Sequence, residues 1–374
     1  MTKEEIHTII KNTLLSDAIG IITEKILAGI RISKEEGLLL YEQGEIGFLG
    51  MLANWINSEK NGKNIYYNKN IHIEPTNYCV NKCKFCSYRK NPGEPGFWDY
   101  SIQEILNIIS QHYKNNITEI HIVGGVHPDR NLYYYADLLK QIKSNFPKLF
   151  IKAFTAVELF YMIEKAKISL YDGLVILKKN GLDSIPGGGA EIFDKKIRSK
   201  ICDEKASAEQ WLEVHKTAHL AGIPSNATML YGHIETYEQR IDHLLQLRNL
   251  QDNTKGFQAF IPLKYRNKNN ELSHLKEVTL TEDLKNIAVT RIFLDNFQHI
   301  KAYWPMLGKE ATEIALTFGV DDIDGTIEDT TKIYTMAGAE ETKPTLSIEE
   351  IKNMVKNAGK EAIERDTVYG IVSE

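Results

Sequence analysis

A short stretch with three cysteines constrains this chain more than any other feature of its sequence. Cys79, Cys83 and Cys86 have the spacing C-x3-C-x2-C, and the fourth cysteine, Cys202, lies far from them in the chain. Cysteine thiolates are the usual ligands of iron–sulfur clusters. Three thiolates leave one iron of a four-iron cluster without a protein ligand, and chemistry can occur at such an open position. We therefore predict that Cys79, Cys83 and Cys86 are metal ligands and that Cys202 is a buried apolar thiol.

A zinc site is the alternative for these cysteines. Structural zinc sites usually have four protein ligands. No C-x2-C or H-x3-H partner lies at a zinc-like distance from this loop. The spacing therefore favours an iron–sulfur cluster.

The composition is that of an ordinary globular protein. The 374 residues are 43% hydrophobic and 25% charged, with a net charge of −5, which is enough chain for one large domain or two medium ones. This charge indicates neither nucleic acid nor an acidic membrane surface as a partner. The first residues do not resemble a signal peptide, and no stretch approaches the length of a membrane-spanning helix. Together with the odd cysteine cluster, this predicts a protein of the reducing cytoplasm.

The order of predicted elements indicates an α/β fold. Residues 1–70 have a helical pattern, and from residue 71 short β-like runs alternate with helical stretches. The eight β-like runs are 71–77, 119–125, 150–156, 183–189, 224–230, 256–262, 299–305 and 321–326, and the helical stretches between them include 103–114, 132–145, 207–220, 236–251, 281–295 and 309–318. Eight alternations predict a (β/α)8 barrel of the TIM type over 71–330, with an N-terminal helical extension and a C-terminal helical tail at 331–374 that packs on the barrel. An open doubly wound sheet is the alternative.

Several of these strands alternate apolar and polar residues. Because successive side chains of a strand face opposite sides, apolar residues that face the helices would leave the polar ones facing the barrel axis. Barrel interiors are normally packed with apolar side chains, so a polar interior indicates a cavity for a polar ligand; a few satisfied buried polar groups are the alternative. The polar residues predicted to face inward are His72, Lys152, Asn226, Thr228, Gln258, Lys301 and Tyr303.

Glycine-rich segments end two of the predicted strands. Gly124 and Gly125 end the second strand, and residues 187–189 end the fourth. Without side chains, such positions allow a ligand to approach the backbone closely, and active sites of these barrels lie at this end of the strands. Glu191 could then accept hydrogen bonds from ribose hydroxyls, as could Glu158 after the third strand. An acid favoured by a helix N-terminus is the alternative for Glu191.

Three further residues are candidates for catalysis. His233 follows the fifth strand and could transfer a proton near neutral pH, although a lone histidine is more often structural. Tyr303 and Asp324 lie at the ends of the last two strands. We predict His233, Tyr303 and Asp324 as catalytic residues.

The cysteine spacing, with Phe85 directly before the last cysteine, resembles that of the radical S-adenosylmethionine (SAM) superfamily. In that superfamily three cysteines bind a [4Fe-4S] cluster, whose open iron binds the amino and carboxylate groups of SAM. The reduced cluster then splits SAM and releases a 5′-deoxyadenosyl radical. The SAM-binding residues that this resemblance implies are Phe85, Gly124, Gly125, Glu158, Glu191 and Asn226.

Other motifs are similar to one subfamily of these enzymes, which includes the aminofutalosine synthases, the dehypoxanthine futalosine cyclases and the deazaflavin-precursor synthases. These motifs lie at 152–158, 186–192, 225–236, 300–304 and 321–326. The last three are similar to the aminofutalosine synthase family in particular. The resemblance extends from about residue 30 to the segment 364–367, which is nearly the whole chain.

This resemblance implies an enzyme of menaquinone biosynthesis. The radical would add to the enol-ether double bond of 3-[(1-carboxyvinyl)oxy]benzoate, the aryl group would migrate from oxygen to carbon, and a carboxylate would be lost. The products would be 6-amino-6-deoxyfutalosine and methionine, so SAM would be consumed, with an electron donor such as flavodoxin or ferredoxin. Two carboxylates in a dry cavity need cations or several donors. The substrate-binding residues expected on this basis are His72, Lys152, Thr228, Gln258 and Lys301, with Arg89 and Arg291 as further cations.

Two rival functions are distinct from this one. A cyclase or deazaflavin-type enzyme of the same subfamily would use the radical to abstract hydrogen, and would release 5′-deoxyadenosine as its main product. A cluster-bearing electron carrier or metal sensor would not be an enzyme. Such a module would need no open iron, so added SAM would leave its EPR spectrum unchanged.

Overall fold

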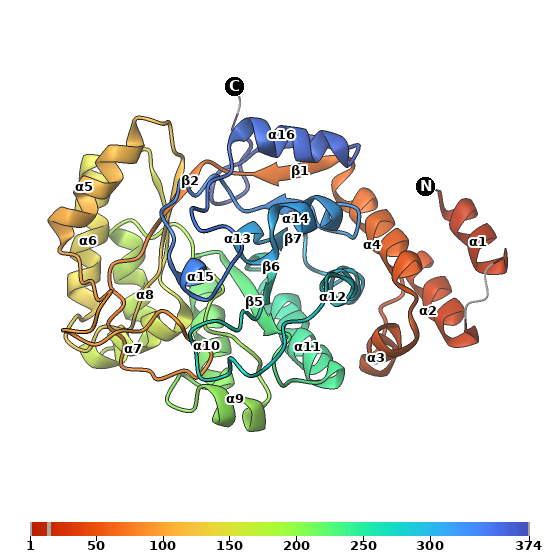
Figure 1. The fold of residues 1–374 in the computed structure, drawn as a ribbon, viewed down its shortest axis with the longest axis horizontal. Helices are drawn as coiled ribbons and strands as arrows, with labels where there is room; N and C mark the ends of the chain where they lie inside the picture. The colour runs from red at the N-terminus through yellow and green to blue at the C-terminus, as the bar shows by residue number, and fades with distance from the viewer. Residues whose placement is uncertain (1, 13–15, 373–374) are drawn as a thin grey trace.

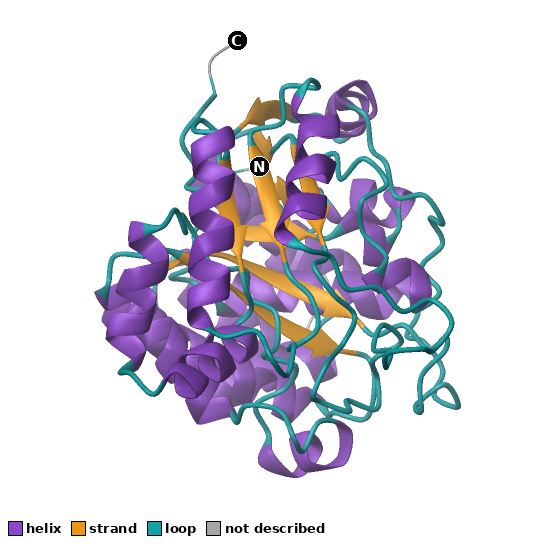
Figure 2. Ribbon diagram, turned by 90° about the vertical axis from the view of Figure 1, so that its left-hand side faces the viewer, coloured by secondary structure: helices purple, strands orange, loops and turns teal. Residues whose placement is uncertain are grey.

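Short strands run through the centre of the molecule, and helices cover them from outside (Figures 1 and 2). The computed structural model describes residues 2–12 and 16–372. The strands are β1 Asn64–Tyr67, β2 Asn70–Ile73, β3 Glu119–Ile122, β4 Phe150–Ala153, β5 Ser225–Tyr231, β6 Phe257–Lys264, β7 His299–Ala302, β8 Asp322–Ile323 and β9 Glu361–Glu364. The helices are α1 Lys3–Asn12, α2 Asp17–Leu27, α3 Lys34–Gln43, α4 Ile46–Asn61, α5 Ile102–Tyr113, α6 Leu132–Asn145, α7 Ala156–Ala166, α8 Leu170–Lys179, α9 Lys195–Ile201, α10 Ala208–Leu220, α11 Tyr237–Thr254, α12 Leu280–Phe293, α13 Trp304–Leu307, α14 Lys309–Ala315, α15 Ile333–Met336 and α16 Ile348–Asn357.

All strand pairs of the central sheets are parallel, as the strand–helix alternation predicts. One sheet has the order β2-β3-β4 and the other the order β5-β6-β7-β8-β1-β9. Single bridges continue the pairing between them: Lys152 with Ser184, Ile185 with Ser225, and Ile71 with Ile327. The strands thus follow one another around the axis in the order of a (β/α)8 barrel. The α/β prediction is confirmed, with the ring held at three places by single bridges instead of continuous ladders.

The fourth predicted strand, 183–189, is reduced to two bridging residues. Ser184 and Ile185 each form one isolated bridge, and Pro186 with three glycines follows. Proline has no N–H to donate to a ladder, and glycine weakens a strand. The segment therefore leaves the sheet as soon as it has linked β4 to β5.

The register of β2, β3 and β4 separates their side chains into two rows. Ile71, Ile120 and Ile151 are paired in register and are fully buried. The next residue of each strand forms the second row, of His72, His121 and Lys152. Since neighbouring side chains of a strand face opposite sides, an apolar row faces the helices and a polar row faces the barrel axis. This is the alternation that the sequence predicts.

Several helices begin with the same local hydrogen-bond pattern. A serine or threonine accepts a hydrogen bond from the backbone N–H three residues on, and a glutamate or glutamine there binds back, in α3, α5, α7, α10, α11 and α16. Such a capping box satisfies donors at the helix start that have no partner within the helix. It fixes where these helices begin relative to the strands before them.

The two flanking segments are not purely helical, which corrects the expectation for residues 1–70 and 331–374. The first contains β1, which pairs with β8 and β9, and the second contains β9. A strand of four residues is too short to show a clear alternation, and β9 finds its partner only when the chain returns across the fold. Each segment therefore contributes one strand to the larger sheet; Figure 1 shows β1 beneath α16 at the top of the molecule.

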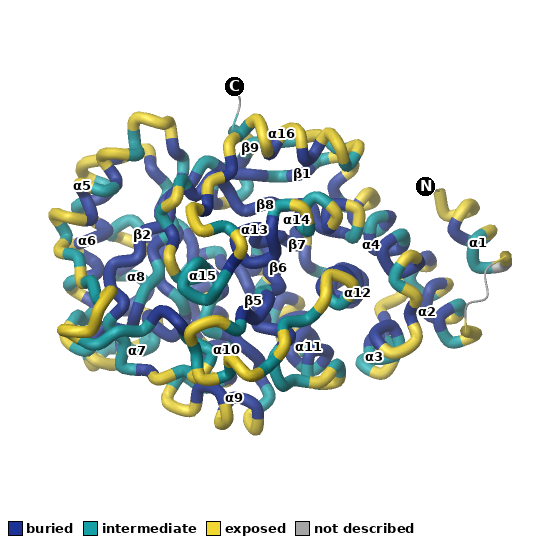
Figure 3. Tube along the Cα trace, viewed as in Figure 1, coloured by how far each residue is buried: buried dark blue, intermediate teal, exposed yellow. Residues whose placement is uncertain are grey.

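The N-terminal helices α1 to α4 cover one side of the barrel. Helix α4 packs along α12, and α3 packs on α11; Figure 1 shows α1 to α4 beside these helices on the right. Close approach needs glycine here, because a Cβ at Gly50 would lie 2.5 Å from the Phe318 ring. Figure 3 shows buried chain in the centre and exposed chain at the rim. No helix of the described residues is long and apolar enough to span a membrane.

Candidate active site

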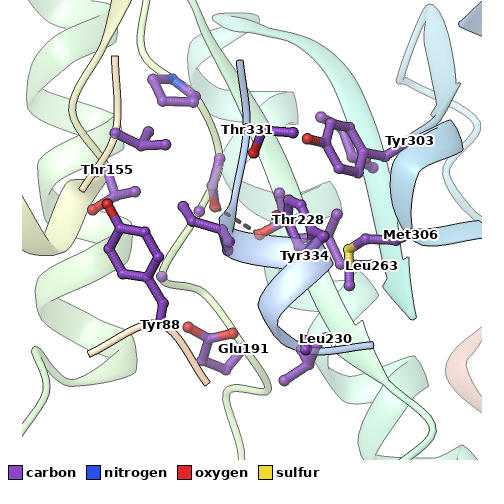
Figure 4. A pocket seen from close by; sticks show the side chains of 18 of the residues that line it. Tyr88, Thr155, Glu191, Thr228, Leu230, Leu263, Tyr303, Met306, Thr331 and Tyr334 are labelled. Carbon is purple, nitrogen blue, oxygen red and sulfur yellow. Dashed lines mark hydrogen bonds between the residues drawn. The ribbon is translucent and has the colours of Figure 1, made fainter. Parts of the chain in front are cut away.

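One cavity lies inside the ring of strands, with a volume of about 240 Å³. Its wall combines the cysteine loop, the glycine-rich ends of strands and the polar row of the barrel interior, and Figure 4 shows part of it. In that view Glu191 lies on one side of the cavity, and Thr331 and Tyr303 lie on the other. Loop residues follow the C-terminal ends of their strands, whereas His72, Lys152 and Lys301 lie within strands. The cavity therefore has an outer end at the cysteine loop and a deeper end between the strands.

The cysteine loop is held by the end of β3. Gly125 N–H donates to the Thr76 carbonyl at 2.8 Å, and Val126 N–H donates to Cys79 Sγ at 3.3 Å. A Cβ at Gly125 would lie 2.3 Å from the Tyr78 carbonyl oxygen. Only glycine allows this approach, so Gly125 has a structural reason to be glycine.

Gly124 has the same packing role and also faces the cavity. A Cβ on it would lie 2.9 Å from the Thr76 carbonyl oxygen, and it lines the cavity, which Gly125 does not. Of the two predicted SAM contacts, Gly124 is thus the one placed to meet a ligand.

The three thiols fit a metal cluster. Cys86 lines the cavity, Cys86 N–H donates to the Cys83 carbonyl at 3.0 Å, and all three residues are partly exposed. Burial raises the pKa of Cys79, although the Val126 N–H opposes this shift, and burial also raises the pKa of Cys83. At Cys79 and Cys83 the thiol is thus favoured over the thiolate until a metal supplies the positive charge that thiolate ligands need.

Lys205 is a cation beside this loop that the sequence did not reveal. It forms an ion pair with Glu191 and lies 5.5 Å from the centre of the Phe85 ring. All three side chains line the cavity. Burial alone would lower the pKa of Lys205, but Glu191 and Cys83 hold it above its usual value. In the sequence, Lys205 lies in the polar loop Asp203–Lys205 and looks like an ordinary solvent-exposed lysine. Nothing in the sequence therefore marked it as a cavity residue.

Glu191 combines this ion pair with an unusual backbone. Its φ is 50°, in the left-handed region that costs energy for residues other than glycine. Such strain occurs at ligand sites more often than elsewhere. Here it places the carboxylate at the cavity wall next to Lys205.

Glu158 has a different place from the one expected. Its carboxylate accepts hydrogen bonds from Thr155 N–H at 2.8 Å and from Gly124 N–H at 3.2 Å, and it does not line the cavity. Burial raises its pKa to about 7, against the opposing effect of these hydrogen bonds. Glu158 therefore links the start of α7 to the glycine that meets the cysteine loop, and its oxygens already have donors.

The deep end of the cavity contains buried ion pairs. Lys152 binds Glu119 at 2.8 Å, and Lys301 lies 3.2 Å from Asp324 and 3.5 Å from Asp322. Burial alone would raise the pKa of Glu119, but Lys152 and an arginine from the C-terminal segment lower it to about 2. Burial lowers the pKa of Lys152 to about 8, with Glu119 opposing the shift. Both lysines thus already have carboxylate partners within the chain.

Arg365 connects this network to the C-terminal segment. Its Nε lies 2.6 Å from Asp322 Oδ2, and the neighbouring Thr367 hydroxyl binds Glu119. Residues that follow β9 thus close the bottom of the barrel beneath the cavity.

Comparison with known proteins agrees with this arrangement. A model of the radical SAM superfamily matches residues 73–247, and a model of the CofH/MqnC C-terminal region matches residues 254–373. The aminodeoxyfutalosine synthase of Thermus thermophilus is 44% identical over 93% of this chain and 94% of its own length. The chain belongs to the aminodeoxyfutalosine synthase family of radical SAM enzymes. It is therefore an enzyme that acts on a small molecule with a [4Fe-4S] cluster and SAM, as the motifs predict.

Two further proteins show how far the likeness reaches. The 5-amino-6-(D-ribitylamino)uracil–L-tyrosine 4-hydroxyphenyl transferase of Methanocaldococcus jannaschii is 38% identical over 91% of this chain and 97% of its own length. The hydrogenase maturase HydG of Carboxydothermus hydrogenoformans has a similar fold, with a TM-score of 0.75 at 17% identity over 98% of this chain and 83% of that one. The radical SAM fold that the cysteine spacing predicts is thus confirmed.

Most residues predicted to meet ligands do line the cavity. The lining residues among them are His72, Phe85, Cys86, Gly124, Lys152, Glu191, Asn226, Thr228, Lys301, Tyr303 and Asp324. Gln258 is not among the lining residues, because only alternate residues of β6, such as Ile261 and Leu263, face the cavity. His121, which sequence reasoning passed over, does line it.

The expectation for His233 is corrected. Its Nε2 lies 3.1 Å from the Leu230 carbonyl oxygen and its Nδ1 lies 3.1 Å from Glu235. It does not line the cavity. Burial lowers its pKa, against the effect of Glu235. His233 therefore stabilises the turn after β5 and has no access to a ligand in the cavity.

The two additional cations also serve the fold. Arg291 forms an ion pair with Asp321 and donates to the Gly319 carbonyl at 2.7 Å. Arg89 donates to the Cys79 carbonyl at 3.0 Å. Neither lines the cavity, so both are removed from the set of expected substrate ligands.

Cluster assembly should depend on three cysteines and not on the fourth. We expect Cys79→Ala, Cys83→Ala and Cys86→Ala to lose the cluster, because two thiolates from one loop cannot hold it. Cys202→Ala is the matched control, since Cys202 is buried at the end of α9 beside the loop, where Lys84 N–H donates to the Ile201 carbonyl at 2.8 Å. The measurement is iron and sulfide per chain after anaerobic reconstitution. Normal iron in Cys83→Ala, or loss of iron in Cys202→Ala, contradicts the prediction.

Removing the charge of Lys301 should destabilise the protein. Lys301→Met leaves Asp324 buried without its cation, and breaking a buried pair costs about 3–5 kcal/mol of unfolding free energy. The double variant Lys301→Met/Asp324→Asn should recover most of this loss. Denaturant unfolding of the three proteins is the measurement. Unchanged stability, with a loss of about 2–5 kcal/mol in substrate affinity, would instead make Lys301 a substrate ligand, as the sequence analysis expects.

The raised pKa of Glu158 predicts a pH-dependent stability. A carboxyl pKa raised from 4.5 to about 7 means that the folded state favours the protonated form. Its stabilising contribution is complete below pH 4.5 and is lost as pH rises through about 7. Between these values the wild type should lose about 3 kcal/mol more than Glu158→Gln. Denaturant unfolding at several pH values measures this.

Glu104→Gln is the control for this measurement. Glu104 has the same capping-box position in α5 but is exposed, and hydrogen bonds from Ser101 lower its pKa. Its replacement should not reproduce the effect. Parallel pH profiles of wild type and Glu158→Gln would show that Glu158 is ionised throughout.

Proposed function

We propose that this enzyme joins the 5′-deoxyadenosyl group of SAM to 3-[(1-carboxyvinyl)oxy]benzoate, with aryl migration and decarboxylation, to form 6-amino-6-deoxyfutalosine and methionine for menaquinone biosynthesis. The observation that carries this proposal is the 44% identity to an aminodeoxyfutalosine synthase over nearly the whole chain. The described residues support the same reaction, because one cavity adjoins both the cysteine loop and a polar interior.

The outer end of the cavity suits SAM. When bound, the cluster and SAM would supply a 5′-deoxyadenosyl radical. Gly124 offers a backbone that a ligand can approach, and Phe85 offers a ring for the adenine. Asn226 also lines the cavity, nearer the start of β5 than Thr228, and its amide oxygen has no hydrogen-bond partner among the described residues. Glu191 and Lys205 lie together at this end, so they can bind hydroxyl, amino and carboxylate groups of SAM.

The deep end offers several polar groups to the carboxylates of the substrate, although its lysines already have carboxylate partners. Lys152, Lys301 and His72 line it, and Thr228 donates to the Gly187 carbonyl at 2.7 Å, which fixes that hydroxyl at the cavity wall. The Tyr303 hydroxyl has no hydrogen-bond partner among the described residues. It is therefore free to donate to a ligand oxygen or to transfer a proton near Asp324.

The wall between the two ends is largely apolar. Leu230, Leu263 and Met306 line it together with the Tyr334 ring (Figure 4). An apolar wall excludes water from the reacting part of a ligand. The proposal includes a flavodoxin or ferredoxin of the cytoplasm, which would donate the electron that reduces the cluster.

Product analysis tests this function. With SAM, the enol-ether benzoate and a strong reductant under anaerobic conditions, we expect an adduct with the mass of 6-amino-6-deoxyfutalosine and one methionine per adduct. Cys86→Ala is the control and should form neither product, because it should lack the cluster. Free 5′-deoxyadenosine as the main product would overturn the proposal in favour of hydrogen abstraction. Turnover of tyrosine would favour a hydroxyphenyl transferase, the activity named for the Methanocaldococcus relative.

A further inference from the structure

Two imidazoles and one carboxylate meet at the deep end of the cavity. His72 of β2, His121 of β3 and Asp324 after β8 each offer one ligand atom, and these atoms all lie within 4.8 Å of one another. His72 and His121 are paired in register on neighbouring parallel strands, and their rings are 4.5 Å apart. Both rings therefore emerge on the same face of the sheet, side by side.

The two imidazoles lack hydrogen-bond partners of their own. Nε2 of His72 and Nε2 of His121 are buried and form no hydrogen bond with the described residues, and only 3% of His72 is exposed. Buried polar atoms in folded proteins nearly always have a partner. Two such atoms next to each other indicate a missing ligand at this place.

Asp324 is oriented toward these nitrogens by a lysine. Lys301 Nζ donates to Asp324 Oδ1 at 3.2 Å, and the other oxygen, Oδ2, lies 3.6 Å from His72 Nε2. One carboxylate oxygen is thus held from behind while the other faces the imidazoles. Carboxylate ligands of metals are commonly held by such an outer partner.

The charges around this place already cancel. Glu119, Asp322 and Asp324 contribute three negative charges, and Lys152, Lys301 and Arg365 contribute three positive charges in direct pairs. A ligand with two carboxylates would therefore be buried here without a compensating charge, which is costly. A divalent cation would restore the balance.

We propose that His72, His121 and Asp324 bind one divalent transition-metal ion. Two histidines and one carboxylate are a ligand set that first-row metals such as iron and zinc accept, and this set leaves coordination positions open. All three residues line the cavity, so the open positions face it. A ligand carboxylate would occupy them; this second step rests on the proposed function, whereas the metal site itself does not.

Metal binding to the substrate-free, cluster-loaded enzyme tests the site. We expect titration with Mn²⁺ to give one bound ion per chain, with pulsed-EPR couplings to histidine ¹⁴N, because the oxidised cluster is EPR-silent. Zn²⁺ should compete for the same site, as measured by elemental analysis after dialysis. His72→Gln and His121→Gln should each weaken Mn²⁺ binding by about tenfold or more, the scale found even for changes around a metal's direct ligands.

His112→Gln is the matched control. His112 also pairs with a carboxylate, Glu328 at 2.8 Å, but lies outside the cavity, so its loss should leave Mn²⁺ binding unchanged. Cluster iron and melting temperature of each variant show whether it has folded. If the two cavity variants fail to fold, bound Mn²⁺ without ¹⁴N couplings in the wild type would still overturn the proposal.

Several results would overturn the proposal. These are the absence of stoichiometric Mn²⁺ binding, bound Mn²⁺ without ¹⁴N couplings, and unchanged binding in folded His72→Gln. A fourth is substrate binding that takes up two protons with no metal present, since protonated imidazoles would then supply the compensating charge. None of the Mn²⁺ measurements involves product formation, so failure of the proposed function would leave them intact and interpretable.

Discussion

The buried ion pairs inside the ring of strands are the interaction on which the rest of the structure depends. Barrel interiors are normally filled by branched apolar side chains, but here Lys152 binds Glu119 and Lys301 binds Asp322 and Asp324. Each pair joins neighbouring strands, so it fixes their register as well as its own charges. Buried charges are tolerated only when paired. The interior can therefore stay polar and partly open, which an apolar core would not allow.

The cysteine loop is tied to this interior by close backbone contact. Gly124 and Gly125 let the end of β3 touch the backbone of Thr76 and Tyr78, and Glu158 holds Gly124 from the other side at 3.2 Å. A side chain at either glycine would push the loop outward. The positions of the three loop thiols and of the cavity wall are thus set by the same few contacts, although their residues lie far apart in the chain.

Much of this could be predicted from the sequence where the signal is local. The cysteine spacing predicts a loop that binds a cluster, and alternation predicted correctly that His72, Lys152 and Lys301 line the interior, because strand side chains alternate by geometry. What sequence could not supply were contacts between distant segments. Lys205 lies in a polar loop and becomes a cavity residue only because Glu191 meets it there. His233 follows the fifth predicted strand, where a catalytic residue was expected. Both of its ring nitrogens, however, already have partners in the same turn, Leu230 and Glu235. The strands β1 and β9 were missed for the same reason, since they find each other across nearly the whole chain.

The two ends of the cavity impose different requirements on a ligand. Near the cysteine loop, backbone groups and the Glu191–Lys205 pair offer hydrogen bonds of several kinds, which suits a zwitterion such as SAM. At the deep end the charges of the six ionised side chains cancel. A charged group of a ligand can therefore be buried there only with a counter-charge of its own. A ligand whose carboxylate enters the deep end together with a cation or with protons would meet the second requirement. The uncharged part of such a ligand would then lie against the apolar wall of Leu230, Leu263 and Met306, where water has least access and a carbon-centred radical finds no polar partner.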